Sequence, residues 1–348
     1  MGAPRIAMLP AHPSQVWILH QVALELGAHA EVLWYVRDKE VSCQVADHLG
    51  LRYSSISASR RGLFGNAFEF MANLFRAIRE TRRNGIEAWV TKYGPGNIAA
   101  RVLGKRSLAF IDDDVDVVPF IAWTSFPFAD RIVSTPTTRL RRFSRKAVRI
   151  PGNLELIYLH PDRFTPDSSV YNELGIPLGS RYALIRLSGL QAHHDLGIRG
   201  ISSELLGKII ELLRAEGMEV FISSESSVGR EFERYLIRIA PERIHHALFY
   251  ARLFIGDSQT MTSESALLGT PAFRVSDFVG RLSYVNRLEE LGLAFGYRPD
   301  DGDRLIADLI YSLGSCGFFE DFLARRDAFL QVTQDPLPIF AKEVLGLF

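Results

Sequence analysis

The stretch LFIGDSQTMTSESALLGTPAFRV, residues 253–275, decides the fold that this sequence predicts. Its first three residues are apolar and form a run of the length found in buried strands. A polar turn at 256–260 follows and leads into a short helical segment. Gly269 suits a left-handed helix stop, and Pro271 prevents the helix from continuing. The stretch therefore predicts a strand, a turn, a helix and a second strand, which is a unit of an α/β domain.

The same stretch contains a candidate binding site. A helix that begins within residues 258–262 points its unpaired N–H groups and the positive end of its dipole beyond the carboxyl end of the strand, which makes an anion site. Glu264 in the first turn can accept hydrogen bonds from a ribose diol, so the pattern indicates a nucleotide. The candidate contacts are Ser258, Gln259, Thr260, Thr262, Ser263 and Glu264. The alternative is that Ser258 or Thr260 only caps the helix and Glu264 only favours its dipole.

Composition places the chain among soluble globular proteins. Its 348 residues suffice for two domains that each bury a core, and 47% are hydrophobic and 23% charged. The two cysteines, Cys43 and Cys316, lie far apart and in no CxxC spacing, so neither a disulfide framework nor a thiolate metal site is expected. No apolar run has the roughly 20 residues of a membrane span. We expect a cytoplasmic protein that neither spans a membrane nor is exported.

The zero net charge hides an asymmetry between the two halves. Residues 1–150 contain 21 lysines and arginines against 13 aspartates and glutamates, whereas residues 151–348 contain 19 against 27. A basic first half can attract a phosphorylated or membrane-associated substrate, although surface arginines without such a task explain it equally well. The overall balance does not resemble that of a nucleic-acid binder.

The first half opens with a βαβ pattern. The strand at residues 5–9 lacks a following GxGxxG, so the dinucleotide fingerprint is absent. His12 lies where the carboxyl end of this strand meets a helix, and it is either a functional base or a turn histidine bonded to the backbone. A later strand at 88–91 leads into a glycine-rich turn, in which Gly94 permits close approach of a ligand.

A run of carboxylates follows the apolar strand at residues 108–111. It consists of Asp112, Asp113, Asp114 and Asp116. Three hypotheses explain it: an Asp-x-Asp metal site, a general base at a cleft, or a solvated turn in which Asp112 or Asp113 caps a helix. The metal hypothesis is weakened because the better phosphate site lies in the other half of the chain.

Residues 60–83 predict an amphipathic helix. Its apolar residues recur at helical spacing and include Phe68, Met71 and Phe75, with six arginines around them. Aromatic residues flanked by arginines suit a membrane interface, but the same stripe also suits packing against a sheet.

Glycines and prolines between residues 151 and 180 predict the connection between two domains. The strand at 182–187 then opens the second domain and leads into Ser188 and a loop with His193 and His194, of which one imidazole can serve in a cleft. A further strand ends at Ser224. His245 and His246 are expected on a helix surface.

The segments RLSGLQAHHD, FISSE, IGDSQTMTSESALLGTP and RVSDFVG resemble an uncharacterised archaeal and bacterial family of GT-B-like proteins, known as a domain of unknown function. That family is similar to nucleotide-sugar glycosyltransferases and to non-hydrolysing UDP-N-acetylglucosamine 2-epimerases. The resemblance implies an α/β fold with two Rossmann-like domains whose parallel sheets face across a cleft. We expect an acceptor-side domain at 1–155, a nucleotide-binding domain at 156–330, and a helix at 331–348 that packs back toward the first domain.

The resemblance also assigns roles to residues. Compared with the epimerase pattern TDSGGIQEE followed by LGKP, Ser258 matches a serine that contacts the diphosphate and Glu264 a glutamate that binds ribose. Gln259 and Thr260 replace the two glycines of that pattern. The loop with His193 matches the position of a histidine-arginine-arginine motif in the epimerases but lacks its arginines. Lys92 or Tyr93 matches the position of the acid in their GDT motif. The last difference disfavours epimerisation.

Together these features predict a glycosyltransferase that uses a nucleotide-activated sugar, UDP-linked, without a metal or other cofactor. The catalytic candidates are His12, Asp113 and His193, and the further substrate contacts are Ser188, His194, Ser224 and Gly94. A UDP-sugar 2-epimerase and a sugar-nucleotide-binding protein without turnover are the alternatives.

Overall fold

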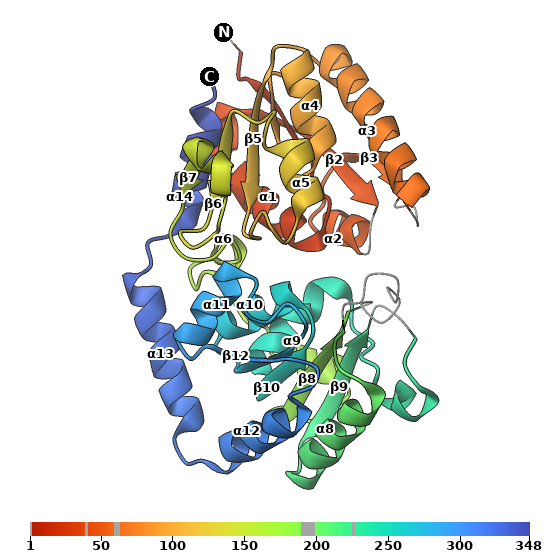
Figure 1. The fold of residues 1–348 in the computed structure, drawn as a ribbon, viewed down its shortest axis with the longest axis vertical. Helices are drawn as coiled ribbons and strands as arrows, with labels where there is room; N and C mark the ends of the chain where they lie inside the picture. Colours follow the sequence, from red (N-terminus) through yellow and green to blue (C-terminus); the bar gives the residue numbers. More distant parts are fainter. Residues whose placement is uncertain (1, 39–40, 59–62, 189–198, 225–226) are drawn as a thin grey trace. The chain divides into compact units, whose positions relative to one another are not determined.

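The computed structural model describes residues 2–38, 41–58, 63–188, 199–224 and 227–348. The chain divides into two compact units (Figure 1). Unit 1 comprises Met1–His160 together with Gln334–Phe348, and unit 2 comprises Pro161–Thr333.

Unit 1 is built on a seven-stranded parallel sheet with the order β3-β2-β1-β4-β5-β6-β7. The strands are β1 (Arg5–Met8), β2 (Glu31–Asp38), β3 (Tyr53–Ala58), β4 (Ala88–Val90), β5 (Arg106–Ile111), β6 (Arg131–Ser134) and β7 (Ala147–Arg149). The helices are α1 (Pro13–Leu26), α2 (Ser42–His48), α3 (Leu63–Arg83), α4 (Gly94–Val102), α5 (Pro119–Ser125), α6 (Leu156–Leu159) and α14 (Pro336–Leu345), with 3₁₀ turns η1 (Gly27–His29) and η2 (Arg141–Lys146).

The central strands of unit 1 are apolar on both faces. Every residue of β4 is fully buried, as are residues 6–8 of β1. This is the pattern of parallel strands covered by helices on both sides, because each face then packs against its own layer. The C-terminal helix α14 belongs to this unit, where Phe340 is buried with its ring centroid 5.6 Å from that of Phe110 on β5.

Unit 2 is built on a five-stranded parallel sheet with the order β12-β11-β10-β8-β9. The strands are β8 (Tyr182–Leu187), β9 (Glu219–Ser224), β10 (Leu253–Gly256), β11 (Ala272–Val275) and β12 (Ala294–Tyr297). The helices are α7 (Val170–Glu173), α8 (Ser203–Ala215), α9 (Ile244–Tyr250), α10 (Gln259–Leu268), α11 (Ser283–Glu290), α12 (Gly302–Gly314) and α13 (Phe318–Val332), with 3₁₀ turns η5 (Arg230–Tyr235) and η6 (Pro241–Arg243).

The strand, turn, helix and strand predicted for residues 253–275 are confirmed, but Glu264 lies in the second turn of the helix rather than in the first. The strand β10 ends at Gly256, the helix α10 follows from Gln259, and β11 pairs in parallel with β10. Gly269 ends the helix at φ 97°, a left-handed conformation that side chains disfavour. The stop signals in the sequence therefore act where they were expected.

Both units are parallel α/β sheets, so the predicted fold class is confirmed. Each sheet has a point at which the strand order reverses, between β1 and β4 in unit 1 and between β8 and β10 in unit 2. Ligands of open α/β sheets bind beyond the carboxyl ends of the strands at such points. Among the helices in the described ranges, none is long and apolar enough to cross a bilayer.

Candidate functional site

A hydrogen-bonded pair of residues lies at the switch point of unit 2, between β8 and β10. Asp257 follows β10 and Ser188 follows β8. One carboxylate oxygen, Oδ1 of Asp257, accepts hydrogen bonds from the backbone N–H of Ser188 at 2.6 Å and from its hydroxyl at 2.7 Å. Burial raises the pKa of Asp257 to about 6, an effect that these hydrogen bonds partly offset. The pair therefore joins the carboxyl ends of the two central strands.

The first turn of α10 lies directly after this pair. Ser258 caps the helix, since its hydroxyl oxygen accepts a hydrogen bond from the backbone N–H of Met261 at 3.3 Å. Within the described residues, the backbone N–H groups of Gln259 and Thr260 have no hydrogen-bond partner. Both residues are partly exposed. These two amides and the helix dipole form a site at which an anion is stabilised.

Two arginines lie in one row of the sheet beside this helix terminus. Arg186 of β8 and Arg274 of β11 both pair with Gly256 of β10, so their side chains leave the sheet on the same face. This is the face opposite the apolar cluster that includes α8 and α12. A Cβ atom at Gly256 would lie 2.9 Å from the carbonyl oxygen of Arg186, so only glycine fits between the two arginines.

The buried Arg274 is connected to the helix terminus. Its Nη1 donates to the side-chain oxygen of Gln259, the first residue of α10, and its Nη2 forms an ion pair with Glu289 at 2.6 Å. Arg186 donates to the hydroxyl of Ser223 at 2.7 Å. Guanidinium groups remain protonated, so both arginines are charged, and Glu289 compensates the charge of Arg274.

The sequence reasoning missed both arginines and Asp257. A signal for the arginines was present, since each interrupts a strand that is otherwise apolar. A charged residue in a strand that is covered on both faces needs a buried partner, and such positions are candidates for binding sites. Asp257 likewise carried a signal, because it follows a strand at the end where ligands collect.

The side chain of Gln259 points back toward the sheet. Its amide nitrogen donates to the carbonyl oxygen of Asp257 at 2.9 Å and to the hydroxyl of Ser276 at 3.3 Å. The glutamine that replaces a glycine of the epimerase pattern is thus held by hydrogen bonds within unit 2. The hydroxyl of Thr262 donates to the carbonyl oxygen of Ser258 at 2.7 Å.

Glu264 is paired with a histidine. Its Oε1 lies 3.0 Å from Nε2 of His245 on α9, and both side chains are buried. The prediction that His245 lies on a helix surface is therefore wrong, because α9 packs this side chain against α10. Ser263 is also buried on α10, and Ser224 ends β9 and is partly buried. The candidates His193 and His194 lie outside the described residues.

In unit 1, the aspartate run lies at the carboxyl end of β5. Lys92, which follows β4, places its Nζ 2.6 Å from Oδ2 of Asp113 and 3.3 Å from Oδ1 of Asp112. Burial alone would lower the pKa of Lys92, but the two carboxylates outweigh it and the pKa rises. Burial raises the pKa of Asp112, an effect that Lys92 partly offsets. A lysine and two aspartates thus form one compensated cluster.

The other two carboxylates of the run also have basic partners. Asp114 is fully buried and accepts hydrogen bonds from the backbone N–H of Arg139 at 2.7 Å and from its Nε at 2.8 Å. Asp116 pairs with Arg141 at 2.6 Å on the surface. In the described part of the chain, no three histidine, cysteine, aspartate or glutamate side chains form a group that could hold a metal ion.

His12 and Gly94 also lie at strand ends of unit 1. His12 caps α1, since its Nδ1 accepts a hydrogen bond from the backbone N–H of Ser14 at 3.3 Å. Its Nδ1 also lies 2.9 Å from the hydroxyl of Ser14. A Cβ atom at Gly94 would lie 2.7 Å from the carbonyl oxygen of Thr124, so the close neighbour of this glycine is the backbone of α5.

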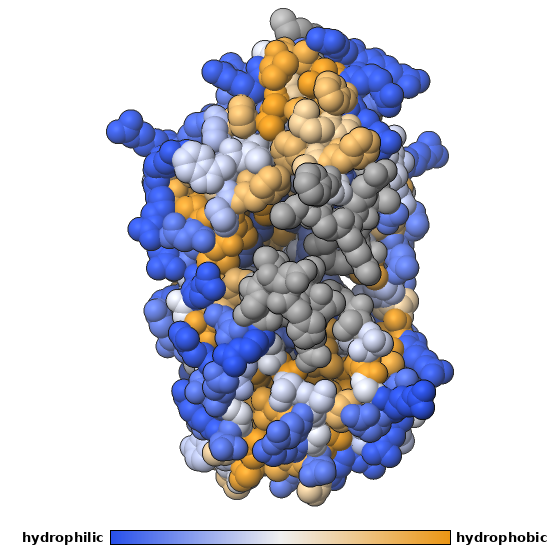
Figure 2. Space-filling view, turned by 45° about the vertical axis from the view of Figure 1, so that its right-hand side comes forward, coloured by the Kyte–Doolittle hydropathy of each residue, from blue (hydrophilic) through white to orange (hydrophobic). Residues whose placement is uncertain are grey.

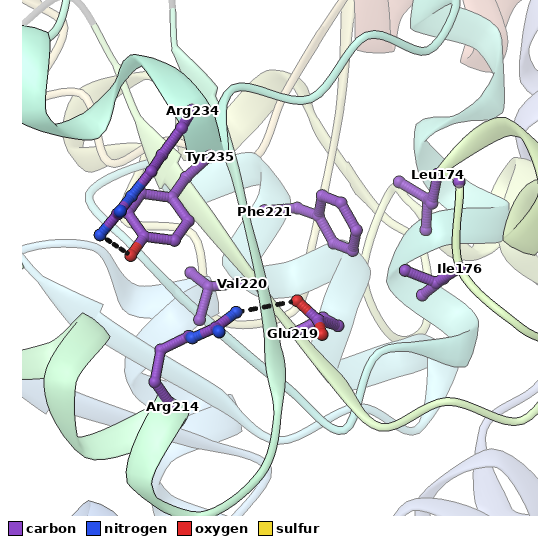
Figure 3. Close-up of a pocket in the computed structure, with 9 residues that line it drawn as sticks. Leu174, Ile176, Arg214, Glu219, Val220, Phe221, Arg234 and Tyr235 are labelled. Carbon is purple, nitrogen blue, oxygen red and sulfur yellow. Dashed lines mark hydrogen bonds and ion pairs between the residues drawn. The ribbon is translucent and has the colours of Figure 1, made fainter.

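A cavity of about 390 Å³ opens on unit 2 away from these residues (Figure 3). Its rim carries the ion pair between Arg214 and Glu219 at 3.0 Å and the hydrogen bond from Arg234 to the hydroxyl of Tyr235 at 2.7 Å. Because Glu219 is the first residue of β9, the cavity lies at the amino end of this strand. None of the candidate site residues in the described ranges lines it.

No protein-family model matches the sequence, and no curated protein matches it. Solved structures do match over nearly the whole chain. MnaA from S. aureus, in a co-structure with UDP, has a TM-score of 0.66 at 10% identity and covers 98% of this chain and 94% of its own. A UDP-N-acetylglucosamine 2-epimerase has a TM-score of 0.65 at 13% identity, and the match covers 97% of this chain and 92% of that protein.

A glycosyltransferase matches equally well. The spinosyn rhamnosyltransferase SpnG, bound to spinosyn aglycone, has a TM-score of 0.63 at 13% identity and covers 97% of this chain and 99% of its own. At these identities the likeness concerns the fold. The chain has the fold of GT-B glycosyltransferases and UDP-N-acetylglucosamine 2-epimerases, with two Rossmann-like parallel sheets.

The lysine cluster of unit 1 predicts a large loss of stability when its cation is removed. Lys92→Met leaves two partly buried carboxylates without their counter-charge and should lower the free energy of unfolding by about 2–3 kcal/mol. Arg141→Met, which removes the cation of an exposed pair, is the control and should change the free energy of unfolding far less. Urea unfolding at pH 7 measures both. Equal losses in the two variants would contradict the compensated cluster.

The raised pKa of Asp257 predicts a pH-dependent stability. Since this pKa rises from 3.8 to about 6 on folding, the folded chain binds more protons between these values, and the resulting stabilisation is lost as the pH rises through 6. In Asp257→Asn this loss is absent. From pH 4 to pH 7, the free energy of unfolding of the unmodified chain should therefore fall by on the order of 2–3 kcal/mol relative to that of Asp257→Asn. Asp303→Asn, at an exposed position of α12, is the control. A pH-independent difference for Asp257→Asn would refute the prediction.

Proposed function

We propose that this protein is a glycosyltransferase that binds a nucleotide-activated sugar, UDP-linked, and transfers the glycosyl group without a metal ion. The observation that carries the proposal is the first turn of α10, where two amide N–H groups lie beside the buried Arg274 at the switch point of the sheet. A diphosphate has the charge and the acceptor oxygens that this site favours. The match to MnaA, whose structure holds UDP, supports this choice of ligand.

In the proposed reaction, an acceptor hydroxyl oxygen attacks the anomeric carbon while the bond from that carbon to the diphosphate breaks. Negative charge accumulates on the leaving diphosphate, and the N–H groups of Gln259 and Thr260 stabilise it by about 3 kcal/mol. Glu264 binds the ribose hydroxyls. Further contacts come from Ser188, Ser224, Ser258, Thr262, Ser263, His194 and Gly94. The roles of Ser258, Glu264 and His194 follow from the sequence resemblance. The other contacts follow from their positions at strand ends or near the start of α10.

The hydroxyl proton passes to Asp113 or His12, and His193 is the third candidate. Asp113 is a partly exposed carboxylate beside Lys92. His12 accepts a hydrogen bond at Nδ1, so its neutral ring carries the proton at Nε2 and would have to change tautomer to act as a base there. This geometry favours Asp113 over His12.

We further propose that the transferred group is a hexosyl or N-acetylhexosaminyl unit and that the reaction serves polysaccharide or glycoconjugate synthesis in the cytoplasm. The acceptor is phosphorylated or membrane-associated. The excess of 21 basic over 13 acidic side chains in residues 1–150 supports an anionic acceptor.

A UDP-sugar 2-epimerase is the second candidate, because epimerases share the fold. The resemblance disfavours it, because Lys92 or Tyr93 matches the position of an acid in the epimerases, and Lys92 is here paired with two aspartates. Proton NMR of UDP-N-acetylglucosamine incubated with the protein alone separates the possibilities. An epimerase interconverts the sugar without an acceptor, a glycosyltransferase does not, and a binding protein turns over neither this substrate nor a donor with an acceptor.

A proline at the first position of α10 tests the diphosphate site. Gln259→Pro removes one of the two N–H groups, and proline is accepted there because Ser258 has the extended conformation required before proline. Gln259→Ala removes the same side chain but keeps the N–H and is the matched control. Relative to Gln259→Ala, Gln259→Pro should weaken UDP binding at least about tenfold in titration calorimetry. Equal affinities of the two variants, both folded by circular dichroism, would refute the site.

A thermodynamic cycle tests the ribose role of Glu264. The unmodified protein should bind UDP about tenfold more tightly than 2′-deoxy-UDP, because the carboxylate accepts a hydrogen bond from the 2′-hydroxyl. Glu264→Ala should bind both ligands with the same weakened affinity. Calorimetry with the two ligands therefore separates a ribose contact from a loss of the buried pair with His245, which would affect both ligands equally. A preference for UDP that persists in Glu264→Ala would contradict the assignment.

A further inference from the structure

The helix α3 exposes its large apolar side chains. Phe68, Met71 and Phe75 are 60%, 46% and 66% exposed. Their spacing of three and four residues places them on one face of the helix. Single exposed apolar residues are common on protein surfaces, but three in one stripe on a helix form a continuous apolar strip.

The inward face of α3 is partly polar. Glu69, Asn73 and Thr81 are buried there, with the buried Ala77 one turn after Asn73. Each has a partner in unit 1, since Glu69 accepts from Arg37 at 2.7 Å, Asn73 donates to the hydroxyl of Tyr93 at 3.2 Å, and the hydroxyl of Thr81 accepts from the indole of Trp89 at 2.9 Å.

Only part of the apolar character of α3 serves the core. Leu74 and Ile78 pack against the cluster around Trp89, whereas the stripe at residues 68, 71 and 75 does not. A helix whose role was only to cover the sheet would turn its largest apolar side chains inward. The stripe therefore needs another explanation than folding.

The neighbouring helix α5 enlarges this surface. Phe120 and Trp123 on α5 are 60% and 55% exposed. Phe70 of α3 packs edge-on against Phe120, with ring centroids 5.6 Å apart, and so joins the two helices. Apolar residues form a continuous strip on the face of unit 1 that comes forward in Figure 2. We call Phe68, Met71, Phe75, Phe120 and Trp123 the aromatic face.

Arginines border the aromatic face. The stripe of α3 continues at the same spacing into Arg79 and Arg82, both exposed. The guanidinium of Arg142 stacks on Trp123 at 3.4 Å from the ring centroid. Of the acidic side chains in the described part of α3, Glu69 is buried with Arg37, and Glu80 is partly buried and bonded to Asn84 and Arg79. The border is therefore positively charged.

We propose that the aromatic face docks unit 1 on the surface of an anionic phospholipid bilayer. Phenylalanine, tryptophan and methionine side chains insert at the level of the headgroups and acyl boundary, and arginines pair with the lipid phosphates. The charge border matches an anionic surface, and the apolar stripe runs along a helix that lies flat on it. This docking does not depend on glycosyl transfer and can be tested without a substrate.

Vesicle sedimentation tests the proposal. At 150 mM salt, the full chain should bind vesicles that contain phosphatidylglycerol and phosphatidylcholine. Its affinity for vesicles of phosphatidylcholine alone should be at least about tenfold lower. Phe68→Ser combined with Phe75→Ser should reduce binding to the anionic vesicles about tenfold, because it removes most of the inserted apolar area. Arg79→Glu combined with Arg82→Glu should do the same and remove the lipid preference.

A matched control lies on α12 in unit 2. Ile310 and Tyr311 are 53% and 68% exposed, outside the aromatic face. Ile310→Ser combined with Tyr311→Ser removes as much exposed apolar surface and should bind the anionic vesicles as the unmodified protein does. Since all these positions are exposed, thermal unfolding should show the variants folded. Equal binding by the Phe68, Phe75 variant and this control would overturn the proposal.

Tryptophan fluorescence locates the contact. Quenching by brominated lipid in the anionic vesicles should be strong in the unmodified protein and several-fold weaker in Trp123→Phe. Of the other tryptophans, Trp34 and Trp89 are buried, and Trp17 is partly buried on α1, outside the aromatic face. Light scattering without vesicles measures whether the protein is a monomer or a dimer and so tests the alternative that the aromatic face joins two copies of the chain. A dimer that dissociates on changing Phe68 and Phe75, with no vesicle binding, would show that the face joins two copies of the chain and would refute a lipid partner.

Discussion

A buried guanidinium is the constraint on which the candidate site depends. Arg274 lies fully buried in the strand β11, and its charge is stable there because Glu289 and Gln259 both accept its hydrogen bonds. The same contacts hold the first residue of α10 against the sheet, so the helix terminus is positioned by a charge rather than by apolar packing alone. The register of the sheet adds Arg186 on the same face, with Gly256 leaving room between the two.

The two units carry different charged residues near the carboxyl ends of their strands. In unit 2, two arginines and the amides of α10 lie near the ends of the central strands, and Asp257 is held by Ser188. In unit 1, four aspartates follow β5, and each of these has a basic partner. An anionic ligand is therefore favoured in unit 2 by the amide groups and dipole of α10, although the sequence of unit 1 is the more basic one. The surplus of basic residues in unit 1 lies partly on the surface of α3 and around Trp123.

The sequence predicted helices correctly but did not determine the direction in which their side chains point. The spacing of apolar residues in 60–83 predicted the helix α3, but one sequence pattern was compatible with both an inward and an outward apolar stripe. The structure divides that pattern, since Leu74 and Ile78 face the core and Phe68 and Phe75 face outward. Likewise, nothing local in the sequence brings His245 to Glu264, because the contact joins two helices that only the packing of α9 on α10 places together.

The sequence by itself determined the parallel α/β class and the strand, helix and strand at residues 253–275. Strand length, the Ser258 cap, the Gly269 stop and Pro271 are local features, and local backbone energetics decide them. The tertiary structure alone decided which charges meet. The row of Arg186 and Arg274, the cluster of Lys92 with two aspartates and the outward face of α3 depend on strand order and register, which bring together residues far apart in the chain.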